Sequence, residues 1–153
     1  MNTGEFWELI GEANELADNP NYSITSPELI AWHTIQLLAT RPPADIVAAQ
    51  GVLDELVARC SVPDLRAAAH EMNGDDVAFT DFCGWLVLQG RRTFENAIAD
   101  PDSLSYRADV RENAVYGTGL ACDRTLTIPL EAYRKATGER RFPAPAEVNP
   151  GGS

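Results

Sequence analysis

The sequence predicts an irregular all-α bundle of six to seven helices. Apolar residues recur every three to four positions through most of the chain, which is the spacing of one helix face. Proline and glycine interrupt this pattern at intervals typical of helix lengths. The chain has 153 residues, 44% of them hydrophobic and 23% charged, which is the size and composition of one globular domain. We therefore expect a single helical domain over residues 1–140.

Two helices are predicted before residue 40. The first begins at Thr3, which can cap it, and ends at Asn19-Pro20-Asn21. The second begins at Ser26-Pro27-Glu28, which supplies a cap, a proline at the first helical position and an acid beside the positive helix end. The side chains expected to point inward are Phe6, Leu9, Ile10, Ala13 and Leu16 in the first helix, and Leu29, Ile30, His33, Leu37 and Leu38 in the second.

Two more helices follow the break at Arg41-Pro42-Pro43. Residues 44–60 repeat isoleucine, leucine and valine on one apolar face. Pro63 opens the next helix, and Asn73-Gly74 closes it, because glycine readily adopts the left-handed conformation that ends a helix.

The strongest predicted helix spans residues 76–89, and Asp75 or Asp76 is expected to cap it. It is apolar on more than one face, which is typical of a central, buried helix. Gly90 then interrupts the chain, and a short helix is expected from Arg91 to Ala99.

The remaining third of the chain has a weaker pattern. Residues 106–116 fit a helix, and residues 118–128 leave open one short strand pair. A last helix is predicted over Pro129–Thr137, with Gly138 as its stop. Residues 141–153 contain proline and glycine but few residues suited to a core, so we expect a disordered tail there.

The net charge of −11 is spread unevenly. Residues 1–60 hold nine acidic and two basic residues, whereas residues 106–153 are nearly neutral. Nucleic acids and anionic membrane surfaces are bound through Lys and Arg, so we expect neither as a partner. A basic protein partner is compatible with this charge, and the structural alternative is that the excess charge only keeps a small domain soluble and monomeric.

The cysteine pattern indicates a cytoplasmic protein with reduced thiols. Cys60, Cys83 and Cys122 are odd in number, and none lies in a C-x-x-C spacing, which argues against a disulfide framework or a zinc site. The N-terminus lacks the basic and apolar regions of a signal peptide, and no apolar stretch approaches the ~20 residues of a membrane span. We predict no metal and no cofactor.

The stretch from Asp64 to Leu104 contains motifs that resemble those of a known family. It contains Asn73-Gly74-Asp75-Asp76, Phe79-x-x-Phe82-x-x-Trp85-Leu86, Gln89-Gly90-Arg91, Phe94-Glu95 and Asp100-Pro101-Asp102. Together with Phe6-Trp7-x-Leu9-Ile10 and Ala132-Tyr133, it resembles the bacterial family of domains of unknown function numbered 4240, over about two-thirds of the chain. Cys83-Gly84 stands where that family tends to have Arg-Ala, and residues 105–128 do not align with it. The resemblance implies a helical fold and brings no activity.

Acidic and histidine side chains flank the predicted central helix. Asp75-Asp76 with Asp81 are candidates for an acid and a base or for holding a divalent cation, and the structural alternative is that one aspartate caps the helix and the other is solvated. His70 could join them as a general base, and its alternative is a surface histidine. If Asp81 lies on a half-buried face, Arg91 or Arg92 is its expected partner.

Candidates for ligand binding lie at the other end of this helix. Arg91 and Arg92 could clamp a carboxylate or a phosphate. Their structural alternative is to compensate the negative end of the preceding helix, with Arg91 paired to Glu95. Gln89 and Trp85 are the further candidates, although all three tryptophans are also expected to anchor the core.

Two functions remain open, beside that of a purely structural subunit. The first, which we favour, is a non-catalytic protein-binding or accessory module, of the immunity type, whose acidic half docks on a basic protein. The second is a small enzyme or small-ligand binder, with a cleft beside the central helix lined by Asp76, Asp81, His70, Gln89, Arg91 and Arg92. The chain contains no recognised nucleophile or phosphate-binding motif, so whether it is an enzyme stays open.

Overall fold

Helices make up all the regular secondary structure of residues 1–143, which are the residues that the computed structural model describes. In chain order they are α1 (Thr3–Ala17), α2 (Pro27–Leu38), α3 (Pro43–Arg59), α4 (Pro63–Asn73), α5 (Phe79–Leu88), α6 (Arg91–Ala99), the 3₁₀ helix η1 (Pro101–Tyr106), α7 (Ala108–Tyr116), the 3₁₀ helix η2 (Asp123–Thr127) and α8 (Ile128–Thr137). The expected irregular all-α bundle is confirmed. Residues 118–128 contain η2 rather than a strand pair.

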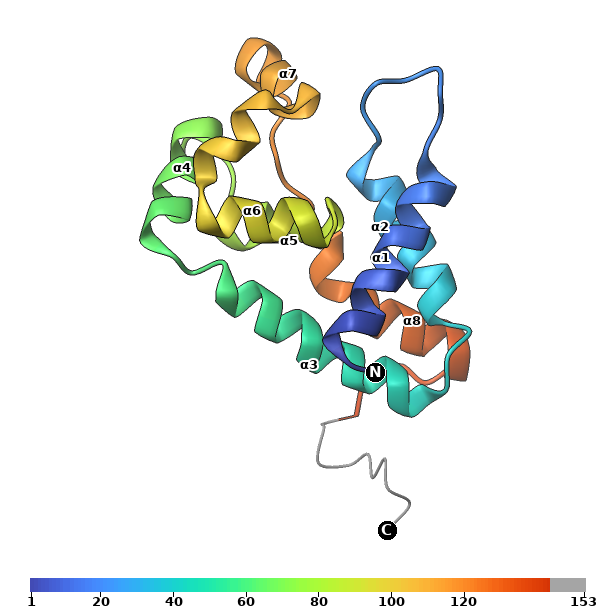
Figure 1. The fold of residues 1–153 in the computed structure, drawn as a ribbon. Coiled ribbons are helices and arrows are strands. Elements are labelled where there is room, and N and C mark those ends of the chain that lie inside the picture. The colour runs from blue at the N-terminus through green and yellow to red at the C-terminus, as the bar shows by residue number, and fades with distance from the viewer. Residues whose placement is uncertain (144–153) are drawn as a thin grey trace.

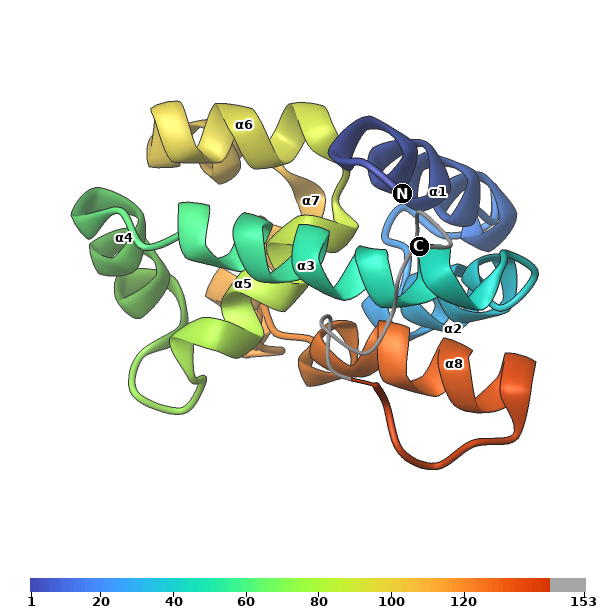
Figure 2. The same ribbon diagram turned by 90° about the horizontal axis from the view of Figure 1, so that it is seen from below.

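The helices form two groups around α5 (Figure 1). On one side, α1 and α2 pair as a hairpin, and α8 packs against α2 and α3. On the other side lie α4, α6, η1 and α7. Helix α5 contacts α2, α3, α4, α6 and η2, and the long helix α3 spans the two groups (Figure 2). The two groups therefore share one central helix.

Helix α5 is buried on every side over its last seven residues, Phe82–Leu88. Its crossing with the η2 segment depends on Gly84, because a Cβ at this position would collide with the carbonyl oxygen of Cys122 and crowd Thr125. Two hydrogen bonds join the segments there. The backbone N–H of Cys122 donates to the carbonyl of Asp81 (2.9 Å), and the Thr125 hydroxyl donates to the carbonyl of Gly84 (3.0 Å).

The predicted helix boundaries agree closely with the structure. Helices α2, α3 and α4 each begin at a proline, which loses no intrahelical hydrogen bond at that position. Gly74 ends α4 and Gly138 ends α8, both with positive φ.

Two predicted caps are wrong. Helix α1 is capped by Asn2 instead of Thr3, in a reciprocal pair with Glu5. Helix α5 starts after Ala78 and has no side-chain cap, since Asp75 and Asp76 belong to the preceding turn.

Three side chains that the helical pattern placed in the core are exposed instead. Leu16 is 55% exposed, Leu29 is 42% exposed and Trp32 is 44% exposed. All three lie on the α1–α2 hairpin. Periodicity identifies the apolar stripe of a helix but not how much of that stripe a neighbouring element covers.

Phe142, within the predicted tail, packs against α8, and Arg140, directly before the tail, is hydrogen-bonded to the same helix. Phe142 meets the ring of Tyr133 edge-on, with the ring centroids 5.3 Å apart, and Arg134 donates to the carbonyl of Arg140. Residues 144–153 of the predicted disordered segment lie outside the described residues.

Gly84→Ala is expected to lower the free energy of unfolding by about 1–3 kcal/mol, because the added methyl group must push η2 away from α5. Gly51→Ala is the matched control, since Gly51 is exposed in α3 with nothing within 4 Å of an added Cβ. It should raise stability by roughly 0.5–1 kcal/mol through helix propensity. Urea unfolding measures both, and equal effects of the two substitutions would contradict the close contact at Gly84.

Candidate functional site

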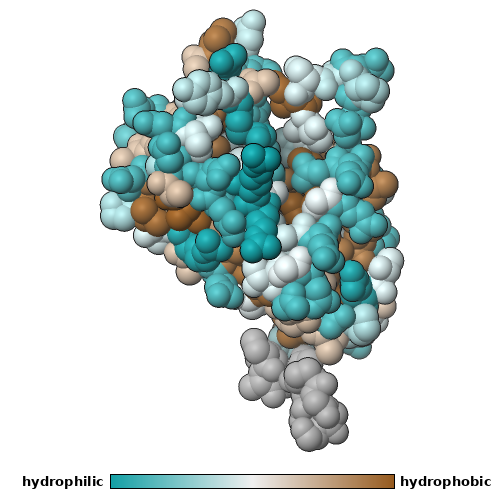
Figure 3. Space-filling model, in the orientation of Figure 1, coloured by the Kyte–Doolittle hydropathy of each residue, from teal (hydrophilic) through white to brown (hydrophobic). Residues whose placement is uncertain are grey.

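A groove separates the two helix groups on the face shown in Figure 3, between the α1–α2 loop and the η1–α7 segment. It consists of two hollows of about 350 and 330 Å³ that share Ile24, Thr25 and Asp109. Gln89 and Arg107 line the first hollow and Trp85 lines the second. We call this feature the interlobe groove. It brings polar groups from α1, the α1–α2 loop, α5 and α7 together.

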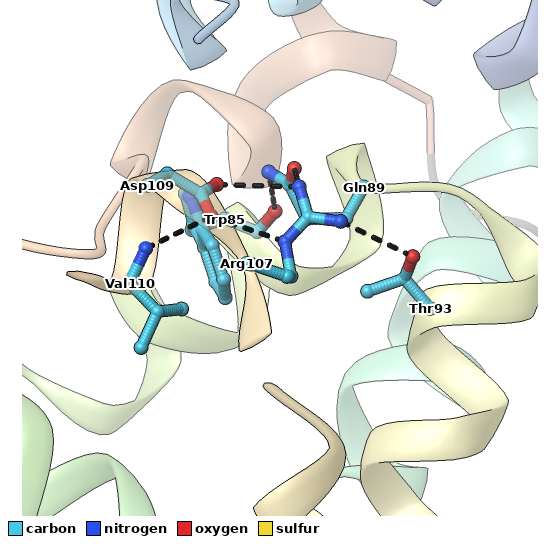
Figure 4. Close-up of polar contacts among 6 residues, drawn as sticks. All are labelled: Trp85, Gln89, Thr93, Arg107, Asp109 and Val110. Atoms are coloured by element: carbon cyan, nitrogen blue, oxygen red, sulfur yellow. Dashed lines mark hydrogen bonds and ion pairs between the residues drawn. The ribbon is translucent and has the colours of Figure 1, made fainter. Parts of the chain in front are cut away.

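Arg107 is the central residue of the groove (Figure 4). It precedes α7, and its Nε and Nη2 donate to Asp109 Oδ1 (3.1 Å) and Oδ2 (3.2 Å). Asp109 lies in the first turn of α7, where the positive helix end favours a carboxylate, and its Oδ1 also accepts from the backbone N–H of Val110 (2.9 Å). This two-point contact is the stronger form of an arginine–carboxylate pair.

The same guanidinium connects α7 to α5 and α6. Its Nη2 donates to Gln89 Oε1 at 2.6 Å, and Gln89 Nε2 donates to the carbonyl of Trp85 at 2.9 Å. Thr93 Oγ1 lies 3.5 Å from Nη1, and the guanidinium carbon lies 5.9 Å from the centroid of the Trp85 ring. Most of the arginine donors are thus used within the protein. The network fixes the wall of the groove and leaves little of the guanidinium for a ligand.

The sequence-predicted site residues are divided among separate places. Gln89 and Trp85 lie at the groove, Trp85 being almost fully buried. His70 lies at the end of α4, with its Nδ1 3.4 Å from Asp75 Oδ1, and Asp76 is exposed in the same turn. Asp81 is half-buried in the first turn of α5.

Arg91 and Arg92 are both exposed at the start of α6, whereas Asp76 and Asp81 lie before α5 and in its first turn. The Nε of Arg91 contacts Glu95 Oε1 at 3.2 Å. Within residues 1–143, Asp81 forms an ion pair with neither Arg91 nor Arg92, and Arg91 forms the i, i+4 pair within α6 that was its structural alternative. The six polar candidates do not share one hollow, because His70 lines the hollow between α4 and α5 whereas Gln89 lines the groove at the other end of α5.

Three residues of the groove were missed by the sequence analysis: Arg107, Asp109 and Asn14. Asn14 Nδ2 donates to the carbonyls of Ile10 and Leu88, both at 2.9 Å, and so ties α1 to the end of α5. The acid at Asp109 is a recognisable signal for a helix start. The contact of Arg107 with Gln89, 18 residues earlier, follows from the chain path and has no sequence signal.

Cys60, Cys83 and Cys122 are buried and none is in a disulfide among the described residues. A hydrogen bond between the thiols of Cys60 and Cys83 lowers the pKa of Cys60 and raises the pKa of Cys83. Burial raises the pKa of the Cys122 thiol, which lies 3.5 Å from Glu28 Oε1. Within residues 1–143, no group of three or more His, Cys, Asp or Glu side chains is placed to hold a metal ion. None of the helices in that range has both the length and the apolarity that crossing a membrane requires.

Asp109→Asn is expected to lower the free energy of unfolding by about 1–3 kcal/mol, because it leaves the partly buried Arg107 without its counter-charge. Glu95→Gln removes the carboxylate of the Arg91 pair, whose side chains are 62% and 43% exposed, and should change stability by less than about 1 kcal/mol. Urea unfolding at neutral pH compares the two. A loss as small at Asp109 as at Glu95 would show that the network does not hold the groove wall.

Cys83 and Cys122 are expected to resist iodoacetamide in the folded protein at pH 8 and to react after unfolding, because the thiolate is the reactive form. Both pKa values lie above the ordinary 9.0. Their contribution to stability is therefore complete below pH 9 and decreases as the pH rises further, since the unfolded thiols ionise first. Peptide mapping after timed alkylation measures the reactivity, and native-state labelling as fast as in urea would contradict the assignment.

The comparisons with known proteins identify a family. A sequence model of the family described as "Protein of unknown function (DUF4240)" matches residues 1–135. The match includes residues 105–128, the segment that showed no likeness by its motifs alone, and it ends inside α8. No curated protein and no solved structure matches the chain. Since the matched residues cover most of the chain, this protein belongs to the DUF4240 family.

Proposed function

We propose that this protein is a binding module that docks on a basic protein partner through its α1–α2 hairpin. The docking region, which we call the hairpin surface, consists of exposed residues of α1, α2 and the loop between them. Its members are Glu8, Glu12, Glu15, Leu16, Asp18, Tyr22, Leu29 and Trp32. The observation that carries the proposal is that residues 1–40 contain six acidic residues and no Lys or Arg.

The acids of α1 weaken the helix that carries them. Glu8 and Glu12 are four residues apart, and Glu12 and Glu15 are three apart, so like charges meet on one helix surface. Each such pair costs roughly 0.2–0.5 kcal/mol. Glu15 and Asp18 also lie near the negative end of the helix, where an acid is unfavourable. A basic partner would relieve both kinds of repulsion, which gives these residues a role that the isolated fold does not need.

Exposed apolar side chains accompany these acids. Of the seven large hydrophobic side chains exposed in residues 1–143, four lie on the hairpin surface, namely Leu16, Tyr22, Leu29 and Trp32. Tyr22 and Leu29 line a common hollow of about 320 Å³. Tryptophan and tyrosine often carry the binding energy of protein interfaces, and their rings attract Lys and Arg. This surface therefore suits a partner that presents basic and apolar residues together.

The charge of the rest of the chain supports the same partner. The net charge of −11 attracts a basic protein from a distance and speeds its association. The finer form of the proposal is an accessory or immunity-type role, in which the acidic surface covers a functional basic surface of the partner.

Glu12→Gln with Glu15→Gln is expected to have opposite effects on stability and on binding. The free protein should gain about 0.3–1 kcal/mol because repulsion within α1 decreases, while the partner should bind at least about tenfold more weakly. Glu139→Gln, on the exposed segment after α8, is the matched control and should change neither quantity much. Thermal unfolding measures the stability, and calorimetry with the purified partner measures the affinity.

Native mass spectrometry of the protein, purified gently from its own host, is the experiment that would identify the partner. A second polypeptide in fixed stoichiometry supports the proposal only if it is basic, if raising the salt from about 0.05 to 0.3 M slows its association about tenfold, and if the double variant loses it. An acidic partner, salt-insensitive binding or full binding by the double variant would reject the hairpin surface as the docking site.

A further inference from the structure

We infer that the pocket between α4 and α5 binds a small carboxylate with an aromatic body. This pocket lies in the helix group opposite the α1–α2 hairpin, and the inference goes beyond the proposed function because it needs no protein partner. Its volume is about 660 Å³, the largest among the described hollows, and falls in the range of sites for small organic ligands.

The pocket has an apolar wall and a polar rim. Pro63, Ala67, Val77, Phe79 and Phe82 supply apolar surface, and Arg66 and His70 stand on α4 four residues apart. The rings of Phe79 and Phe82 are stacked, with their centroids 6.1 Å apart and their planes at 17°. Phe82 is fully buried, whereas Phe79 is partly exposed, so an aromatic ligand would pack against Phe79 and the aliphatic lining; burial of its ring supplies most of the binding energy.

Arg66 is the group that selects a carboxylate. Its guanidinium carbon lies over the Phe79 ring, 4.2 Å from the ring centroid. Arg66 is an exposed residue, and none of the ion pairs within residues 1–143 includes it. A stacked guanidinium keeps its planar edge free for two parallel hydrogen bonds to a carboxylate. The contact with Phe79 also limits its motion, which reduces the entropy lost when a ligand binds.

The acids near the pocket do not cancel this preference. Asp75, the only acidic residue among the described residues that lines it, contacts His70 at 3.4 Å instead of Arg66. The negative charge of the whole chain opposes an anion at long range, but salt screens it beyond ~8 Å under physiological conditions. Inorganic anions should therefore bind poorly, because they gain the Arg66 contact without burying an aromatic ring.

Three probes share a phenyl group and a chain of similar length but differ in the charge of the end group: 4-phenylbutyrate, 4-phenylbutyramide and 4-phenylbutylamine. They distinguish the contribution of charge to the affinity from that of ring burial. Titrations followed by backbone amide NMR should show the carboxylate shifting residues 63–82, with an affinity at least about tenfold above that of the amide. The amine should bind more weakly still. Equal affinity of the three probes, preference for the amine, or no shift within residues 63–82 would overturn the inference.

Arg66→Met and Arg59→Met form a matched pair of variants. Arg59 also lies over an aromatic ring, that of Phe94 at 5.4 Å, but it lines none of the hollows described above. Arg66→Met should lower the affinity for 4-phenylbutyrate about tenfold and leave the affinity for the amide unchanged, whereas Arg59→Met should keep both. Retention of carboxylate binding by Arg66→Met would also overturn the inference.

Discussion

The crossing of α5 and the η2 segment at Gly84 is the contact on which the arrangement of the other elements depends. Glycine inside a helix costs roughly 1 kcal/mol relative to alanine, and here it permits Cys122 and Thr125 to lie directly on the helix backbone. Because η2 covers this face, α5 is buried on all sides and both helix groups can pack against it. Helix α8, which follows η2 directly, is thereby brought against α2 and α3.

The features with functional interest lie at different ends of this central helix. The N-terminal end of α5, with Phe79 and Phe82, forms a wall of the pocket that faces α4. The C-terminal end, with Trp85 and Gln89, forms part of the interlobe groove and is held by Arg107 and Asn14. The C-terminal end of α5 also positions the α1–α2 hairpin, through the hydrogen bond from Asn14 to the carbonyl of Leu88. Ligand binding at the pocket and protein binding at the hairpin can therefore be tested independently.

Electrostatic effects in this protein operate on two length scales. The excess of acidic residues is concentrated in residues 1–105, and its field attracts basic macromolecules during diffusion. Salt screens that field at distances beyond about 8 Å. The selectivity of a site for a ligand at shorter range therefore depends on individual side chains. Within residues 1–143, Arg66 at the pocket has no carboxylate partner, whereas most of the donors of Arg107 at the groove are used by Asp109 and Gln89. Arg66 therefore has more hydrogen-bond donors left for a ligand than Arg107 has.

The sequence alone determined the helical class, most helix boundaries and the burial of α5. These depend on interactions within a few residues of the chain, such as proline at a helix start, Gly74 and Gly138 at helix ends, and the period of apolar residues. Only the tertiary structure decided that Leu16, Leu29 and Trp32 are exposed, that Arg107 reaches Gln89, and that His70 and Gln89 line different hollows. These outcomes depend on which elements cover one another. The path of the whole chain sets that coverage, and no local pattern records it.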